Sequence, residues 1–145
     1  MTPLPAETNF LDLARQVLDA QPFSRLVGAR VTACQDGHAE LEVDVRPDLL
    51  QQYGLVHGGV YAYLADNVIA FAAGSVLGPS VVSTGLTLEL VGNVREGTVV
   101  AVADVGRRTA DEVEVAIEIV GRREGQDDKV CARATGTARL TSSGG

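Results

Sequence analysis

One carboxylate, Asp66, stands alone in the middle of the sequence. Between Leu49 and Leu88 it is the single Asp, Glu, Lys or Arg, and the residues around it are rich in Ala, Val and Leu. A carboxylate inside an apolar segment is costly unless it has a partner or a task, and removal of water from it would increase its basicity. We therefore interpret Asp66 as a catalytic base or nucleophile, with a solvent-facing Asp as the alternative.

Two glycines, Gly58 and Gly59, stand where a helix is expected to begin. Glycine leaves the backbone N–H groups uncovered, and the start of a helix carries a positive partial charge. An oxygen with developing negative charge can bind to such a helix start. A tight turn or close packing would also explain the pair. We expect His57, just before them, to position a ligand rather than to act as a base.

The spacing of these residues predicts a site that is shared between two chains. Asp66 follows Gly59 by seven residues, which is about 10 Å along a helix axis. It therefore cannot reach a carbonyl group that is bound at the start of its own helix. A second helix that runs the other way could supply the acid, so we predict a homodimer in which one chain provides Gly58 and Gly59 and the other provides Asp66.

The elements that must carry these residues follow from the hydrophobic pattern. Residues 58–77 lack the alternation of a strand and are apolar nearly all round, which predicts a long helix enclosed by the rest of the fold. Strands are expected where apolar and polar residues alternate. Together they predict an α+β fold in which an antiparallel sheet covers the helix. The expected strands are Leu26–Ala33 and His38–Val45 around an Asp36-Gly37 turn, then Leu86–Leu90, Thr98–Val105, Glu112–Ile119 and Lys129–Leu140.

The two ends of the chain are expected to be simple. Thr8 can cap a short helix over residues 8–20, and Pro22 should stop it. Residues 142–145 are Ser and Gly and are expected to form a flexible tail. The first twelve residues contain no basic residue and no long apolar run, unlike a secretory signal, so we expect a cytoplasmic protein.

Composition excludes several function classes. A chain of 145 residues is the size of one domain, and its net charge of −7 disfavours general binding to nucleic acid or an anionic membrane. The two cysteines, Cys34 and Cys131, are interpreted as reduced and structural, and no Cys/His cluster has metal-ligand spacing. The common serine-hydrolase, P-loop and dinucleotide motifs are absent from the sequence.

The central motif resembles that of a known family. Gly54-Leu55-Val56-His57-Gly58-Gly59, followed by Leu64-Ala65-Asp66, is similar to the signature of the hotdog-fold acyl-CoA thioesterases of the phenylacetate-degradation (PaaI-like) group. Residues 22–31 also resemble the opening strand of that family, and the likeness extends from about Pro22 to Leu140. It implies a single hotdog thioesterase domain over residues 1–145, with a long central helix wrapped by an antiparallel β-sheet. It also implies homodimers that pair into homotetramers, and hydrolysis of small aryl- or short- to medium-chain acyl-CoA thioesters. No metal or separate cofactor is implied, since coenzyme A is part of the substrate.

The resemblance also assigns residues to roles. Asp66 matches the catalytic carboxylate, and Gly58, with Gly59 beside it, matches the amide that polarises the thioester carbonyl. Gln51 matches a polar residue near that carbonyl, and Ser83 matches a hydroxyl near the attacking water. Four further residues are expected to contact substrate: His57, Thr84, Arg107 and Arg108, the two arginines through the phosphates of coenzyme A.

The chain also departs from the family pattern, and other functions stay open. Where many members carry Leu-Arg-Pro, this chain has Leu90-Val91-Gly92-Asn93-Val94, so it lacks the Arg of that segment. A hotdog dehydratase that acts on hydroxyacyl thioesters and a non-catalytic acyl-CoA-binding protein are the alternatives. The acyl group is not fixed by the sequence, although four aromatic residues could line a pocket for an aryl group: Tyr53, Tyr61, Tyr63 and Phe71.

Overall fold

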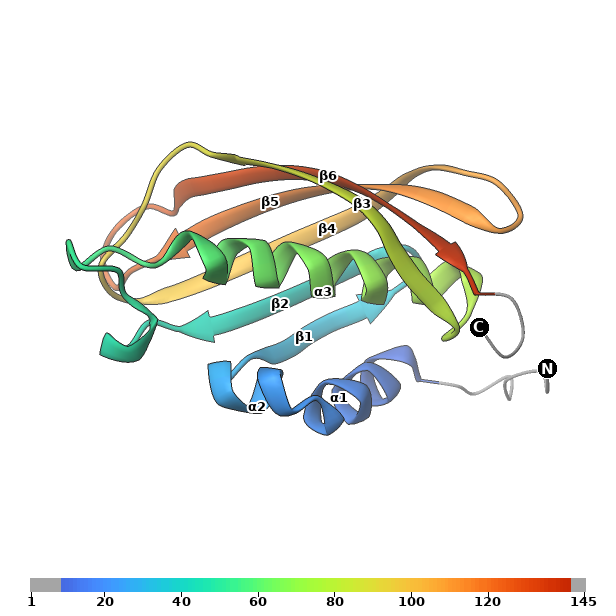
Figure 1. Cartoon of the computed structure of the whole chain (residues 1–145), viewed down its shortest axis with the longest axis horizontal. Helices are drawn as coiled ribbons and strands as arrows, with labels where there is room; N and C mark the ends of the chain where they lie inside the picture. The colour runs from blue at the N-terminus through green and yellow to red at the C-terminus, as the bar shows by residue number, and fades with distance from the viewer. Residues whose placement is uncertain (1–8, 142–145) are drawn as a thin grey trace.

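A long helix, α3 (Gly58–Leu77), lies against one face of a six-stranded antiparallel sheet that curves over it (Figure 1). The computed structural model describes residues 9–141, so Thr8, predicted as a helix cap, and the predicted tail over 142–145 lie outside it. The strand order is β1-β2-β4-β5-β6-β3. The predicted hotdog fold is therefore confirmed. The strands are β1 (Arg30–Gln35), β2 (His38–Asp44), β3 (Val81–Leu90), β4 (Thr98–Arg108), β5 (Glu112–Arg122) and β6 (Lys129–Leu140).

The helix α3 begins and ends where the sequence predicts. It is long and apolar enough to cross a membrane by length and composition alone, and 56% of its most apolar window is buried inside this fold. Its burial is not complete, because one stripe along the helix stays outside the core. That stripe, with residues that are exposed or half-buried, consists of Gly59, Ala62, Tyr63, Asp66, Asn67, Ala70 and Gly74.

Small side chains on β6 allow α3 to lie close to the sheet. A Cβ atom on Gly136 would lie 2.3 Å from Ile69 Cδ1 of the helix and 3.0 Å from the carbonyl oxygen of Gly85. The inward positions on either side of Gly136 are alanines, and all of them are buried. They are Ala132, Ala134 and Ala138. Because β6 presents almost no side-chain volume here, the helix fits directly beneath it.

The N-terminal region differs from the prediction. The first helix, α1 (Phe10–Ala20), is capped by Asn9, whose Oδ1 accepts the Leu11 N–H at 3.0 Å. Pro22 ends α1 but also begins a second helix, α2 (Pro22–Val27), so the expected strands over 26–33 and 22–31 are wrong in their first residues. Proline suits the first position of a helix, and Gly28, with φ of 84°, ends α2 in the left-handed conformation. A short 3-10 turn, Pro47–Leu49, follows β2.

The other predicted elements are confirmed. The strands β3, β4 and β5 are longer than expected, β2 ends one residue earlier, and β6 has the expected bounds. The turn between β1 and β2 has φ of 52° at Asp36 and 82° at Gly37, as a two-residue hairpin turn requires. Both cysteines are buried and free, and burial raises the pKa of the Cys34 thiol to about 11. A reduced, structural role for the cysteines is therefore consistent with their positions.

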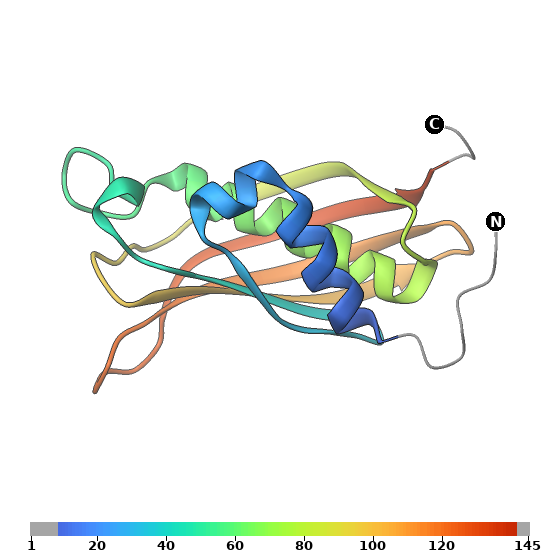
Figure 2. The ribbon, with the colours of Figure 1, turned by 90° about the horizontal axis from the view of Figure 1, so that it is seen from below.

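One edge of the sheet is covered by a helix and the other is not. The edge strand β1 has α1 packed beside it, and Figure 2 shows α1 and α2 on the same side of the sheet as α3. No described element covers the opposite edge, which is β3. Three apolar side chains of this strand are among the large exposed ones of the chain: Val82, Leu86 and Leu90. An uncovered apolar edge strand is a surface on which another strand can pair.

The close approach of α3 and β6 gives a prediction about stability. Substitution Gly136→Ala should lower the free energy of unfolding by about 1–3 kcal/mol, because the new methyl group overlaps Ile69 Cδ1. Ile69→Val removes that atom, so the double variant should lose less than the two single variants added together. Denaturant unfolding measures all three. Strict additivity in the double variant would contradict a direct clash between these residues.

Candidate active site

The start of α3 leaves one backbone donor free. His57 is the N-cap residue, and its Nδ1 accepts the Gly59 N–H at 2.8 Å. The Val60 N–H donates to the His57 carbonyl at 2.9 Å. Among residues 9–141, no hydrogen bond is recorded from the Gly58 N–H. Gly58, rather than Gly59, therefore carries the available donor at the positive end of the helix.

Asp66 lies about two turns further along the same helix, on the exposed stripe. It is exposed in the single chain, and its carboxylate forms no ion pair with any described basic side chain. The expectation that the rest of the chain encloses α3 on all sides, and Asp66 with it, is therefore wrong. The eight residues from Gly58 to Asp66 correspond to about 12 Å of helix axis, so the two groups cannot meet on one carbonyl within a chain.

Ser83 lies beside Asp66, whereas Thr84 points elsewhere. Ser83 Oγ donates to the main-chain carbonyl of Asp66 at 3.5 Å. The register between β3 and β6 shifts between Ser83 and Gly85, which leaves Thr84 in a β-bulge. The Thr84 hydroxyl lies 2.8 Å from the Thr137 hydroxyl on β6. Of the two predicted hydroxyl residues, only Ser83 is near the carboxylate-bearing turn of α3.

Gln51 belongs to the loop that leads into α3. That loop is closed on itself, because Leu50 pairs with Val56 and the Gln51 N–H donates to the Leu55 carbonyl at 2.8 Å. The side-chain carbonyl of Gln51 accepts the Tyr53 N–H at 2.6 Å. Gln51 therefore lies in the segment next to the helix start, and its side-chain oxygen already accepts one hydrogen bond from within the loop.

Arg107 and Arg108 are far from the helix start within one chain. They are exposed at the end of β4, before the hairpin that leads to β5. Strand pairing places this hairpin near the C-terminal end of α3. The start of β5 pairs with the end of β6, and the end of β6 pairs with the start of β3. The strand β3 in turn follows directly after α3 in the chain. Figures 1 and 2 show this hairpin at the opposite end of the molecule from Gly58.

A mostly apolar cavity of about 420 Å³ lies beside the helix start. Phe23 and Leu26 of α2 form one wall and are 59% and 70% exposed. Tyr63 forms another wall, and its ring centroid lies 5.3 Å from that of Phe23. The Tyr63 hydroxyl donates to Ser24 Oγ at 2.5 Å, so the ring has a fixed position. The remaining lining residues are Val27, Arg46, Asp48, Leu49, Leu50, His57, Gly59 and Val60.

The sequence predicts this cavity only in part. Of the four aromatic residues proposed for it, only Tyr63 lines it. Tyr61 is buried in the core, Tyr53 is exposed on its loop, and Phe71 lines a separate cleft between α1 and α3. Phe23 and Leu26 were missed because their segment was expected to be a strand. Proline at the first position and glycine after the last position of residues 22–27 were the signal for a helix.

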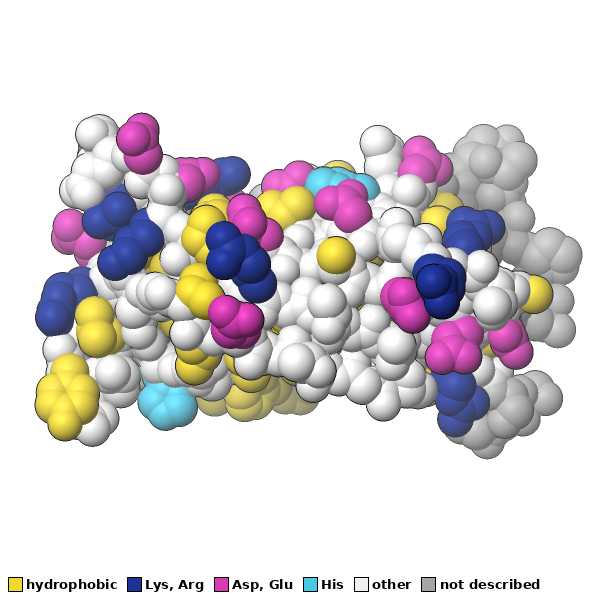
Figure 3. Space-filling view, turned by 90° about the horizontal axis from the view of Figure 1, so that it is seen from above, with side chains coloured by type: hydrophobic (Ala, Val, Ile, Leu, Met, Phe, Trp, Pro, Cys, Tyr) yellow, Lys and Arg dark blue, Asp and Glu magenta, His cyan; other side chains and the backbone are white. Residues whose placement is uncertain are grey.

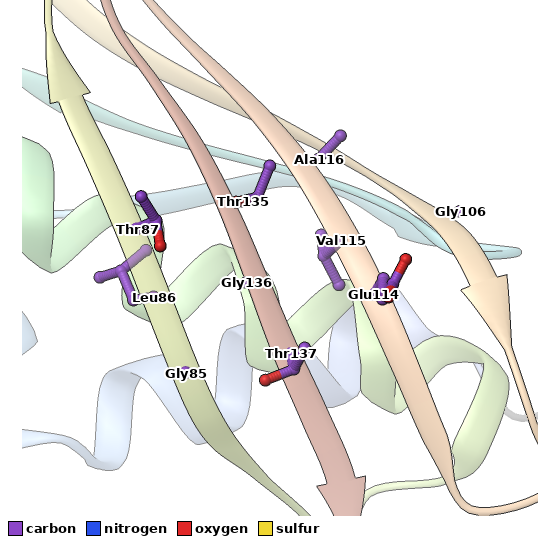
Figure 4. Close-up of a pocket in the computed structure, with 10 residues that line it drawn as sticks. All are labelled: Gly85, Leu86, Thr87, Gly106, Glu114, Val115, Ala116, Thr135, Gly136 and Thr137. Carbon is purple, nitrogen blue, oxygen red and sulfur yellow. The ribbon is translucent and has the colours of Figure 1, made fainter.

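A depression of about 490 Å³ lies on the outer face of the sheet and is separate from these groups (Figure 4). It is lined by small residues of β3, β4, β5 and β6, with Glu114 as its one ionisable side chain. Figure 3 shows uncharged atoms in the middle of this face, with charged side chains to the left and right of them and a His with acidic side chains along the upper rim. Within residues 9–141, no cluster of three or more His, Cys, Asp or Glu side chains is placed to hold a metal ion.

Comparison with known proteins assigns the family. The model of the Thioesterase superfamily matches residues 53–127, just over half of the chain. The chain therefore belongs to the thioesterase superfamily. A candidate esterase of Mycobacterium tuberculosis (strain H37Rv) is 34% identical over an alignment of 88 positions, which covers 57% of this chain and 63% of that relative. The match thus spans less than two thirds of the relative's length.

Solved structures share the same architecture. The structure of the Mycobacterium tuberculosis protein is 27% identical, with a TM-score of 0.75 over 84% of this chain and 98% of that one. A mutant of the phenylacetic acid degradation protein PaaI from Thermus thermophilus is 28% identical, with a TM-score of 0.73 over 83% and 100% of the two chains. A thioesterase family protein from Silicibacter pomeroyi, 22% identical, has a TM-score of 0.83 over 92% and 100%. This last likeness concerns the fold alone.

His57 accepts hydrogen bonds from the first turn of α3 through both its side chain and its carbonyl, and this gives a prediction about its role. Substitution His57→Ala should remove the cap of α3 and lower the free energy of unfolding by about 0.5–1 kcal/mol. If His57 is a cap and not a base, thioester hydrolysis should fall only a few-fold, on the order of the effect of a lost contact. Steady-state kinetics and denaturant unfolding measure both quantities.

Asn9→Ala is the matched control, because Asn9 caps α1 in the same way. It should lower stability by a similar amount and leave hydrolysis unchanged. A loss of activity in His57→Ala as large as that in Asp66→Ala would contradict the capping role and favour a His in the chemistry, as a dehydratase would need.

Proposed function

We propose that this chain hydrolyses the thioester bond of a small acyl-CoA, as a member of the PaaI-like group. The observation that carries the proposal is the free Gly58 N–H at the start of a 20-residue helix, between two residues, His57 and Gly59, that line an apolar cavity. A thioester carbonyl whose oxygen accepts this N–H would have its developing negative charge stabilised in the tetrahedral state. The adjoining cavity would hold the apolar acyl group.

Asp66 supplies the attack on that carbonyl. Its carboxylate either removes a proton from water, which then attacks the acyl carbon, or attacks that carbon itself to form a mixed anhydride that water opens. In both cases the bond from the acyl carbon to sulfur breaks, the thiol leaves as coenzyme A, and the acid is released. Ser83, beside Asp66, would orient the water, and Gln51 would contact the carbonyl region.

Two chains are needed to bring these groups together. Gly58 and Asp66 are about 12 Å apart along one helix axis, and the stripe that carries Asp66 consists mostly of small residues. Small residues let two helices approach closely, and the uncovered apolar strand β3 runs beside them. A two-fold axis with the helices antiparallel would align Asp66 of one copy with Gly58 of the other and would also cover Asp66.

The same arrangement gives Arg107 and Arg108 a role. Within one chain they lie at the opposite end from Gly58 (Figure 1), but antiparallel pairing carries them to the end where the partner's helix begins. Exposed guanidinium groups at the rim of the site would suit the phosphates of coenzyme A. We assign this contact to the partner chain rather than to the chain that supplies Gly58.

Pairing of two dimers is the further assembly that we propose. The outer face of β3, β6 and β5 has an uncharged central band, Thr87, Thr135 and Ala116, which lies between Glu114 on one side and the ion pair of Glu118 and Arg133 on the other (Figure 4). A surface with few charged side chains loses little solvation when a second sheet covers it. The band therefore supports a tetramer in which sheets pack outer face to outer face.

The first prediction separates the two halves of the site. Gly58→Pro removes the N–H, and proline is tolerated at the first residue of α3. It also adds a Cβ atom 3.3 Å from Leu90 Cδ1, a contact that Gly58→Ala reproduces. His57, with ψ of 136°, already has the conformation that precedes proline. We expect kcat to fall about 10²–10³-fold in Gly58→Pro, while Gly58→Ala, which keeps the N–H, retains most of the activity. Asp66→Asn and Asp66→Ala should abolish hydrolysis.

Mixed dimers test whether the site is shared. A purified heterodimer of one Gly58→Pro chain and one Asp66→Ala chain has one intact site, so it should regain about half the activity of the wild-type dimer. Heterodimers as inactive as both parents would contradict the shared site. Wild-type protein that binds acyl-CoA without releasing thiol would instead favour the non-catalytic binding protein.

The cavity predicts the size of the acyl group. Phe23 and Tyr63 suit a single aromatic ring or a short chain, and Phe23→Ala would lengthen the cavity. We expect the ratio of kcat/KM for octanoyl-CoA to that for phenylacetyl-CoA to rise about ten-fold in Phe23→Ala. Val17→Ala, an exposed apolar residue of α1 outside this cavity, is the control. An unchanged ratio would place the acyl group elsewhere.

A further inference from the structure

The segment after β3 holds the loop that leads into α3. Val94 is buried, and a Cβ atom on Gly121 of β5 would lie 2.5 Å from it, so Val94 anchors the segment to the sheet. The Val94 carbonyl accepts the Val56 N–H at 3.1 Å. Arg95 Nη1 donates to the Tyr53 carbonyl at 2.8 Å. The connection from β3 to β4 thus contacts the loop at two backbone positions, at the same end of the molecule (Figure 1).

Asn93 makes the contact that is nearest to the helix start. Its Nδ2 donates to the Val56 carbonyl at 3.0 Å, while its Oδ1 accepts the Tyr61 hydroxyl at 2.5 Å and the Val94 N–H at 2.8 Å. Tyr61 is 1% exposed, and burial raises the pKa of its hydroxyl, so that hydroxyl stays protonated as a donor. One amide side chain therefore joins the loop, the first turn of α3 and the strand connection.

These contacts leave the Gly58 N–H with little freedom. The Val56 carbonyl belongs to the peptide group that ends at the His57 nitrogen, and the His57 N–H donates to the Leu49 carbonyl at 2.9 Å. The His57 carbonyl and side chain accept the N–H groups of Val60 and Gly59. Both sides of His57 are therefore fixed, and the next N–H in the chain, that of Gly58, has its direction set by them.

We propose that Asn93 is a positioning residue that aims the Gly58 N–H at the substrate carbonyl. The inference rests on the proposed function of Gly58 and extends it to a residue that contacts no substrate. Because a donor helps most when it is already aligned with the developing charge, a small rotation lowers the rate of the chemical step more than it lowers substrate binding.

Asn93→Asp is the sharpest test, since it keeps the shape and one acceptor oxygen but puts a second oxygen opposite the Val56 carbonyl. We expect kcat to fall about 10–100-fold, less than on removal of the donor itself, with KM changed less than about three-fold. Tyr61→Phe removes one oxygen atom and leaves the Asn93 amide in place, so kcat should fall only about two- to five-fold. Tyr61→Phe also serves as the second variant if Asn93→Asp does not fold.

Ser75→Ala is the matched control. Ser75 is buried near the other end of α3, where its Oγ accepts the Gly37 N–H and donates to the Ala72 carbonyl, both at 2.8 Å. Its loss removes two hydrogen bonds of a buried side chain far from Gly58. Ser75→Ala should lower the free energy of unfolding but change kcat less than about two-fold, because residues that are far apart act nearly independently. Destabilisation alone is thereby separated from misalignment.

A second readout does not depend on thioesterase activity. In an amide ¹H–¹⁵N spectrum of the assembled protein, the Gly58 resonance should move in Asn93→Asp and in Tyr61→Phe and stay in place in Ser75→Ala. An unmoved Gly58 resonance, unchanged kcat, or a raised KM with kcat intact would overturn the positioning role. If wild-type protein hydrolyses no acyl-CoA, the proposed function fails, and the spectra still decide whether Asn93 orients the Gly58 amide.

Discussion

The close contact between α3 and β6 determines where every other group lies. Gly136 leaves no room for a Cβ atom between the strand and the helix, because Ile69 Cδ1 would lie 2.3 Å from it, and the alanines beside Gly136 are buried. The helix is therefore held at one depth beneath the sheet, with the same side chains always inward. The stripe that faces away from the sheet is fixed by this contact as well, and it is the stripe that carries Asp66.

The loop before the helix converts this rigid body into a site. An isolated helix start has several unpaired N–H groups that water would satisfy. Here the Gly59 N–H is used by His57 and the Val60 N–H by the His57 carbonyl, so only the Gly58 N–H remains. Because one N–H remains free, a hydrogen-bond acceptor can bind at the helix start from one direction. The apolar cavity between α2 and Tyr63 lies next to this donor, since His57 and Gly59 line it, and in the proposed function it would hold the acyl group.

Most of the fold could be predicted from the sequence because its signals are local. The limits of α3 follow from the glycines at its start and from the apolar pattern over residues 58–77. The strands after it follow from alternation, since one face of the sheet is buried and the other is not. The segment 22–27 could not be told from a strand by its apolar residues alone. There the terminal Pro22 and Gly28 carried the information. The exposure of Asp66 was missed because α3 is apolar nearly all round, and a composition cannot say which stripe stays uncovered.

The sequence indicated the main residues of the candidate site, but it did not indicate which other residues of the chain hold them in place. Gly58, His57 and Asp66 could be recognised as candidates because the residues around them are otherwise uncharged. Their separation along the helix axis could be calculated from their positions in the sequence alone. Asn93 gave no such signal, because a single Asn in a loop is typical of many turns. Its importance depends on contacts with Val56 and Tyr61, which lie more than thirty residues away in sequence.

The bulge in β3 lets one strand serve two environments. Side chains in a regular strand change faces at every residue, so positions three apart lie on opposite faces. Ser83 and Leu86 are three apart, yet both pair with inward positions of β6, because Thr84 is the extra residue between them. One inserted residue thus shifts the phase of the strand. A polar segment can face Asp66 while an apolar segment continues on the same side toward Leu90 and Gly58, and neither has to give up its inward position.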